Sequence, residues 1–136
     1  MKTKTIKQAI SFNTTPIKVY EMIMNAEKHS AFTQSKVEMS PEVKGNFCVF
    51  DGYCHGYNIE LIEGEKIVQA WHFEEDGWPE DHYSICTFHI DLENNKTKLY
   101  FEQSGIPEHK AKSLFDGWEK YYWKPMKEFI KNGGVK

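Results

Sequence analysis

The strongest constraint on the fold is an amphipathic pattern that runs from residue 108 to residue 131. Apolar side chains recur there at i, i+3, i+4 and i+7, with lysine and glutamate on the opposite side, which predicts one long helix of about 30 Å. Pro125 lacks an N–H and predicts a bend, and Asn132-Gly133-Gly134 predicts the helix end. The apolar positions are Ala111, Leu114, Phe115, Trp118, Tyr121, Tyr122, Met126, Phe129 and Ile130.

Residues 36–105 show a different sequence pattern, in which short runs of β-forming residues are separated by turn residues. This pattern predicts an antiparallel meander. Asp51-Gly52 suits a two-residue type I′ hairpin turn, since both residues tolerate a positive φ. That turn would set Cys48 opposite His55 and turn Cys54 to the other face, which excludes a disulfide between the two cysteines. Further strands are predicted near 65–74, 82–92 and 96–104.

The N-terminal segment predicts a strand over residues 4–12 and then two short helices. Thr15 suits an N-cap and Pro16 a first helical position, with Val19, Tyr20 and Ile23 on one face. Asn25 restarts a second helix that carries Ala26, Ala31 and Phe32. A sheet with one apolar face must be covered, and only the last helix is long enough to do it. The order therefore predicts an α+β fold in which a curved antiparallel sheet wraps around the C-terminal helix.

Length and charge restrict the class of protein. The 136 residues match a single domain over 1–136, and the net charge of −3 gives no electrostatic footprint for nucleic acid or an anionic membrane surface. The start, Met1-Lys2-Thr3-Lys4-Thr5, lacks the apolar stretch of a signal peptide, and no segment is long and apolar enough to span a membrane. Three cysteines without metal-ligand spacing predict free thiols. We expect a cytoplasmic monomer.

Aromatic residues make up 15% of the chain and must either fill the core or line a hollow in it. We predict that some of them line an apolar cavity between the sheet and the 108–131 helix. The facing of the central hairpin stays open: Phe47 and Val49 could be buried with Cys54, or Cys48 and Phe50 with Tyr57 and Ile59. The candidate cavity residues are Phe47, Val49, Tyr57, Trp71, Phe73, Tyr83, Ile85, Phe101, Phe115, Trp118 and Tyr122.

Several short segments occur in an order and spacing that match a known family. They are Phe50-Asp51-Gly52, Ile67-Val68-Gln69 followed by Trp71, Trp78-Pro79-Glu80-Asp81-His82-Tyr83-Ser84, Thr97-Lys98-Leu99 with Phe101, Gln103-Ser104-Gly105-Ile106-Pro107, and Gly117-Trp118-Glu119-Lys120-Tyr121-Tyr122-Trp123-Lys124-Pro125. With these segments, the chain resembles the C-terminal domain of the activator of the heat-shock protein 90 ATPase, within the helix-grip (START-like, Bet v 1-like) superfamily. The resemblance covers nearly the whole chain and implies the helix-grip fold.

The same resemblance implies two functions. One is the binding of a hydrophobic small molecule, and the alternative is a co-chaperone-like protein that binds heat-shock protein 90 and modulates its ATPase. The family commonly has a basic residue where this chain has His72, and the stretch from Phe73 to Trp78 is longer and more acidic than usual. The separate domain that does most of the ATPase stimulation in the eukaryotic activator has no counterpart in these 136 residues.

Motifs for catalysis or metal binding are missing from the sequence. The acidic stretch 74–82 lacks calcium-loop spacing and has one histidine, so we predict neither a metal site nor a cofactor. His72 and His89 lie on predicted strands and could approach each other or a carboxylate. A weak enzyme would need His72 and a carboxylate pointing into the cavity. We therefore predict a non-enzymatic binding domain.

Overall fold

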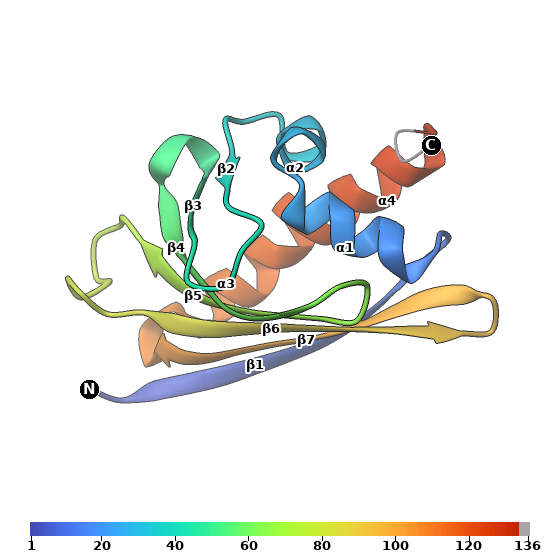
Figure 1. The fold of residues 1–136 in the computed structure, drawn as a ribbon. Helices are drawn as coiled ribbons and strands as arrows, with labels where there is room; N and C mark the ends of the chain where they lie inside the picture. Colours follow the sequence, from blue (N-terminus) through green and yellow to red (C-terminus); the bar gives the residue numbers. More distant parts are fainter. Residues whose placement is uncertain (134–136) are drawn as a thin grey trace.

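A computed structural model describes residues 1–133 and has the predicted α+β helix-grip fold, with one antiparallel sheet curving around the C-terminal helix (Figure 1). Its seven strands lie in the order β1-β7-β6-β5-β4-β3-β2. The last helix crosses the concave face of the sheet, with α1 and α2 beside its C-terminal half. The elements are β1 (Thr3–Phe12), α1 (Pro16–Met24), α2 (Ala26–Thr33), β2 (Glu38–Met39), β3 (Asn46–Val49), η1 (Phe50–Gly52), β4 (Cys54–Ile62), β5 (Lys66–Phe73), β6 (Ser84–Glu93), β7 (Lys96–Pro107), η2 (Glu108–Lys110), α3 (Ala111–Trp118), η3 (Glu119–Trp123) and α4 (Lys124–Lys131).

The two short helices form where the sequence predicts them. Pro16 opens α1, and the side chain of Asn25 caps α2 by accepting a hydrogen bond from the N–H of Lys28 at 3.0 Å. Thr15 adopts the extended N-cap conformation, but its side chain makes no capping hydrogen bond. In α2, the exposed Ala31 does not join Phe32 in the core, and His29 is buried instead. The burial of this histidine has no signal in the apolar pattern.

The central hairpin has the predicted register and turn. Cys48 lies opposite His55, and φ is positive at Asp51 (58°) and Gly52 (94°), as a type I′ turn requires. Phe50 also has a positive φ of 51°, which ends β3 at Val49. The facing left open by the sequence is settled, because Phe47, Val49 and Cys54 are the residues that point into the core.

Strand β7 continues to Pro107, whereas the last strand was predicted to end near residue 104. The pairing with β1 bulges there instead of ending: Ile6 pairs with Gln103 but Lys4 with Ile106, which leaves one extra residue in β7. Gly105 lies in this extra stretch with a φ of 75°, a conformation that glycine adopts without steric cost. The glycine therefore marks a β-bulge and not the end of the sheet.

The C-terminal helix contains a π-helical turn, η3, between α3 and α4, and its dihedral angles are helical at both junctions. Pro125 comes directly after this turn and cannot donate the hydrogen bond that an α-helix would need there. The π turn brings residues five apart onto one face, so Trp123 stacks on Trp118 with 5.4 Å between ring centroids. Phe115 and Tyr121 were predicted on the apolar face, but 45% and 50% of their surfaces are exposed.

The helix ends as predicted at its described residues. Asn132 is the C-cap, and Gly133 has a φ of 76° and donates its N–H to the carbonyl of Ile130 at 3.0 Å. Gly134, the third residue of the predicted stop, lies outside the described residues.

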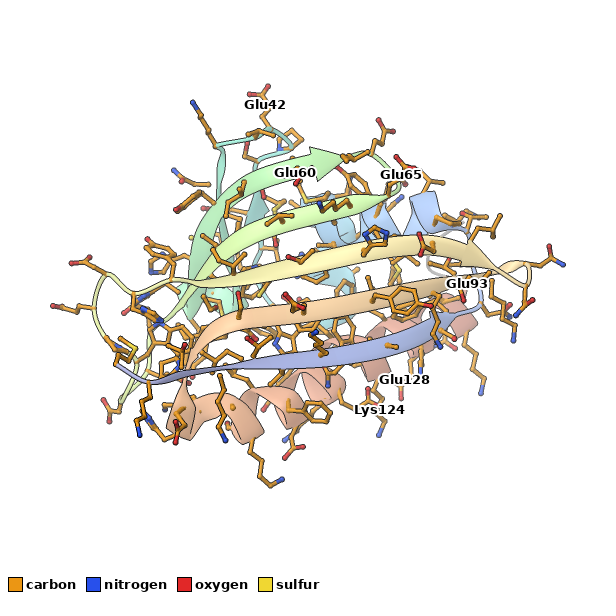
Figure 2. All side chains as sticks on the ribbon, turned by 90° about the horizontal axis from the view of Figure 1, so that it is seen from below. Glu42, Glu60, Glu65, Glu93, Lys124 and Glu128 are labelled. Carbon is orange, nitrogen blue, oxygen red and sulfur yellow. The ribbon has the colours of Figure 1, made fainter. Side chains whose placement is uncertain are left out.

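The three cysteines, Cys48, Cys54 and Cys86, are free thiols, as predicted. In the part of the chain that the structure describes, no helix combines the length and apolarity needed to cross a membrane. Six charged side chains labelled in Figure 2 project away from the interior between sheet and helix: Glu42, Glu60, Glu65, Glu93, Lys124 and Glu128.

Candidate functional site

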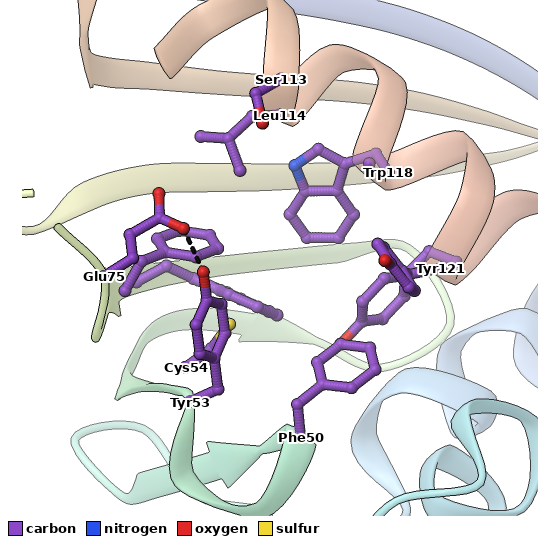
Figure 3. A pocket seen from close by; sticks show the side chains of 12 residues that line it. Phe50, Tyr53, Cys54, Glu75, Ser113, Leu114, Trp118 and Tyr121 are labelled. Carbon is purple, nitrogen blue, oxygen red and sulfur yellow. Dashed lines mark hydrogen bonds between the residues drawn. The ribbon is translucent and has the colours of Figure 1, made fainter. Parts of the chain in front are cut away.

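A pocket of about 430 Å³ opens between the sheet and the first half of the C-terminal helix (Figure 3). Its walls come from α3 and η3, from the ends of β4 and β5, and from the turn between β3 and β4. This volume lies within the range of small-molecule sites, roughly 300–1,000 Å³. The lining residues are Phe50, Tyr53, Cys54, Trp71, Phe73, Glu75, Ser113, Leu114, Gly117, Trp118, Tyr121 and Tyr122.

Two buried indoles, Trp71 and Trp118, form the inner wall and meet edge to face at 5.1 Å. The indole N–H of Trp71 donates to Gln69 Oε1 at 2.9 Å, and that of Trp118 donates to Gln103 Oε1 at 2.7 Å. Gln103 in turn donates to the Ser84 hydroxyl at 2.9 Å. Because these buried polar groups satisfy one another, the indoles are held in one orientation and offer apolar surface to the pocket.

One edge of the pocket is polar. The Tyr53 hydroxyl donates to Glu75 (Figure 3), and the Lys110 ammonium lies 3.4 Å from the other Glu75 oxygen. Burial raises the pKa of Tyr53, and the Glu75 carboxylate raises it further, so the phenol stays protonated at neutral pH. Glu75 thus gives an otherwise aromatic pocket one hydrogen-bond acceptor at its rim.

The opposite edge is formed by Phe50 against the π turn. Its ring meets Tyr121 at 5.8 Å and Tyr122 at 5.9 Å, both edge to face. The left-handed backbone of Phe50 costs on the order of 1–3 kcal/mol for an aromatic residue. Without that conformation the chain would continue as a strand, and the ring would not reach the helix. Strain at this position therefore shapes the rim of the pocket.

Tyr122 is held from behind by a buried histidine on α2. The Tyr122 hydroxyl donates to His29 Nε2 at 2.7 Å, while His29 Nδ1–H donates to the Ile23 carbonyl at 2.9 Å. Burial lowers the pKa of His29 to about 4, so the imidazole is neutral at physiological pH. This pair fixes the Tyr122 ring as a wall of the pocket, and sequence reasoning did not anticipate it.

No lining residue of the described chain has the features of an activated nucleophile. Cys54 is the strongest candidate by residue type, but burial raises its pKa well above that of an exposed thiol, so it stays protonated. The pairing required for a weak enzyme is not met either. His72 and its neighbour Glu74 lie on the outer face of the sheet, away from the pocket.

The structure separates the predicted cavity residues into three groups. Trp71, Phe73, Trp118 and Tyr122 line the pocket. Phe47, Val49 and Phe101 are buried in the adjoining core without lining it. Tyr57, Tyr83, Ile85 and Phe115 do not face the pocket.

The prediction that these four residues line the cavity was wrong, for two reasons. Tyr57 alternates with the inward Cys54, and Ile85 with the buried Ser84 and Cys86, so they belong to the other face of the sheet; Tyr83 precedes β6 and is exposed. Phe115 lies on the solvent side of α3.

Several lining residues were missed by the sequence prediction of the cavity. Leu114 and Tyr121 were assigned to the apolar helix face, and Phe50 to a family segment, but none was assigned to the cavity. The role of Gly117 is recognisable only from the structure, in which a Cβ at this position would meet just Tyr121 Cδ2, at 3.9 Å. The missing side chain therefore adds space to the pocket. The other missed residues are Tyr53, Cys54, Glu75 and Ser113.

Comparison with known sequences identifies relatives over most of the chain. The profile of the family described as "Activator of Hsp90 ATPase homolog 1-like protein" matches residues 13–131. The human activator of 90 kDa heat shock protein ATPase homolog 1 is 30% identical over 124 residues, which cover 91% of this chain and 36% of that protein. A homologue from Dictyostelium discoideum is 32% identical over 119 residues, covering 87% and 30% of the two chains. The chain thus spans about a third of the length of these relatives.

Solved structures with low sequence identity share the fold. An HSP90 activator from Plasmodium falciparum superposes with a TM-score of 0.86 at 21% identity, covering 93% of this chain and 96% of that one. The Aha1 dimer from Colwellia psychrerythraea gives a TM-score of 0.75 at 17% identity, with coverages of 93% and 95%. At these identities the likeness establishes the fold alone.

Proposed function

The chain belongs to the family of activator of Hsp90 ATPase homolog 1-like proteins, and from this premise we propose that it is a non-enzymatic binding domain for a hydrophobic small molecule. The observation that carries the proposal is the aromatic pocket of about 430 Å³. Its indoles are already held in place by buried glutamines, so a ligand does not have to order them on binding. The family is named for activators of an ATPase and is not a classical enzyme family.

The lining defines the chemical class of the ligand. Indole and phenyl surfaces suit a compact aromatic or alicyclic body, and Glu75 at the rim suits a single hydroxyl donor. Because Lys110 balances the charge of Glu75, the rim selects neither cations nor anions by net charge. We infer a neutral, largely apolar molecule with one hydroxyl group, for which naphthol and menthol serve as probes.

Calorimetric titration of the chain with naphthol and menthol tests this proposal against a variant that fills the pocket. Gly117→Leu places a side chain into the open space, and leucine also favours the helix. We expect saturable binding to the natural chain and at least a tenfold loss in Gly117→Leu, whose melting temperature should not fall.

Gly117→Ala is the matched control, because one methyl group removes little volume and should leave most of the affinity. Binding that is equal in the natural chain and Gly117→Leu would place the ligand elsewhere. A lack of saturable binding by both probes would contradict the proposal.

A second candidate function rests on the family itself. We propose as the alternative that the chain binds the heat-shock protein 90 of its own cell and modulates its ATPase, because its relatives are named as activators of the 90 kDa heat shock protein ATPase. The test is a titration against the isolated middle and N-terminal domains of that chaperone, with ATPase turnover followed in parallel. Failure to bind at high micromolar concentration would end this alternative without affecting the pocket.

Domain organisation and location are proposed with the same function. The described residues share one continuous hydrophobic core, which supports a single domain over residues 1–136. Free cysteines suit a reducing compartment, so we propose a cytoplasmic protein. We also propose a monomer, although the relative from Colwellia psychrerythraea is described as a dimer. Light scattering over a tenfold concentration range distinguishes the two states.

A further inference from the structure

A second group of chemically active side chains lies on the outer face of the sheet. His55 on β4 and His72 on β5 are directly opposite each other in the strand pairing, with ring centroids 4.9 Å apart. Glu74 follows two residues after His72 and so projects from the same face. One of its oxygens, Oε1, lies 2.8 Å from His55 Nε2 and 3.3 Å from His72 Nε2. Two imidazoles and a carboxylate thus converge on one point.

The orientation of His72 is fixed from behind. Its Nδ1–H donates to the carbonyl oxygen of His82 at 2.8 Å, and the same oxygen accepts the indole N–H of Trp78 at 2.8 Å. A carbonyl can only accept, so His72 Nδ1 carries a proton and donates it, which leaves Nε2 as the ring nitrogen that faces outward. His72 Nε2 thus points toward the carboxylate of Glu74.

The imidazole nitrogen and the carboxylate oxygen, 3.3 Å apart, are placed so that both could bind one cation. A histidine that donates one ring N–H to a backbone carbonyl has its ring fixed in the way that is typical of a metal ligand. His72 is also nearly buried, with 6% of its surface exposed, so its ring is fixed before any ion arrives.

We propose that His55, His72 and Glu74 form a binding site for a zinc ion. Zinc prefers imidazole and carboxylate ligands at about 2.0–2.2 Å, which in a tetrahedron sets ligand atoms about 3.4 Å apart. The three ligand atoms all lie within 4.8 Å of one another, so small side-chain rotations reach this geometry. With three protein ligands, the fourth position is open to water on the exposed side, where Glu74 and His55 lie.

The site escaped the sequence prediction because its ligands do not share a segment. Zinc motifs are recognised by short spacings along the chain, whereas His55 and His72 belong to different strands and meet only through their register. The prediction that the chain has no metal site came from the spacing within 74–82 and between the three cysteines, and the proposed zinc site departs from that prediction.

Zinc at this site would connect β4 to the loop that follows β5. Glu74 is the first residue of that loop, and its neighbour Glu75 turns the other way, to the rim of the pocket. A metal held by Glu74 would therefore restrain the residue that carries the pocket's only carboxylate. This link to the pocket rests on the proposed function, but zinc binding itself does not depend on it.

The test uses the full, untagged and metal-free chain without any apolar ligand. Calorimetric titration with zinc chloride measures affinity, and cobalt absorption together with imidazole NMR shifts reports which side chains coordinate. We expect one site, with shifts confined to His55 and His72. His55→Ala and Glu74→Gln should each weaken zinc binding at least tenfold, since loss of one of three ligands removes a coordinate bond.

His89→Ala is the matched control, because His89 is an exposed histidine of β6 that lies beside Asp91 at 3.5 Å, outside the cluster. It should change the zinc affinity less than twofold. Circular dichroism shows whether each variant is folded, and both ligand positions are exposed enough for that to be expected. No saturable binding of zinc below millimolar concentration, or equal binding by all variants, would overturn the proposal, whatever the pocket binds.

Discussion

The interior between sheet and helix is packed at one end and hollow at the other. At the packed end, α1 lies against β6 and β7, and residues such as Val19, Met22 and Leu99 are completely buried. At the hollow end, α3, η3 and the turn at Phe50 cover the sheet, and the pocket remains. The difference lies in the covering elements: α1 brings the flexible or aliphatic side chains of Val19, Met22, Ile23 and Met24, which fill gaps, whereas the hollow end is walled by rigid rings.

Truncating the same residue type at each end should give the largest contrast. Leu99→Ala leaves a cavity in a closed core and should lower the free energy of unfolding by about 4 kcal/mol. Leu114→Ala enlarges a space that already exists and should cost about 1 kcal/mol or less. Urea unfolding of both variants measures the difference. Equal losses would mean that the two ends are packed alike.

Acid should weaken the contact between α2 and the pocket wall through His29. The folded pKa is about 4, below the ordinary 6.5, so between these values the unfolded chain binds a proton that the folded chain does not. The contribution of neutral His29 to the free energy of unfolding is fully present above pH 6.5. It is lost as the pH falls toward 4, by about 3 kcal/mol in total.

The comparison of the natural chain with His29→Gln isolates this effect from the titration of carboxylates. The variant should be less stable at pH 7, and its stability should change less between pH 6.5 and pH 4. An unchanged slope would show that His29 is protonated in the folded protein.

A small gain in stability is expected where the hollow end has room. Gly117→Ala should raise the free energy of unfolding by about 1 kcal/mol, because glycine inside a helix is unfavourable and the new methyl group meets only Tyr121. Thermal unfolding measures the change. Destabilisation by this substitution would indicate that the space beside Gly117 is not open.

The secondary-structure elements and their order could be predicted well from the sequence. Element order, strand register at Asp51-Gly52 and the apolar helix face followed from local patterns, since turn chemistry and side-chain periodicity act over a few residues. The π turn breaks that periodicity, which is why Trp123 was missing from the predicted core and Tyr121 was misplaced. An apolar pattern with a period of 3.6 residues cannot reveal a helical turn that contains one extra residue.

The pocket could be predicted only in part, because its lining depends on which face each strand presents. Trp71 and Phe73 were identified, but Tyr57 and Ile85 were assigned to the wrong face. A shift of one residue in a strand moves every side chain to the opposite face of the sheet, and the sequence did not decide which face points inward. The His55–His72 pair depends on register across two strands and has no local signal at all.

The central claim, an open apolar pocket at one end only, can be tested through the tryptophan indoles. Trp71 and Trp118 line the pocket, whereas Trp123 is buried behind Trp118 without lining it and Trp78 lies in the loop after β5. Titration with naphthol, followed by indole N–H resonances, should move Trp71 and Trp118 most, in a saturable way that Gly117→Leu abolishes. No saturable shift, or shifts as large at Trp123 as at Trp118, would contradict the account.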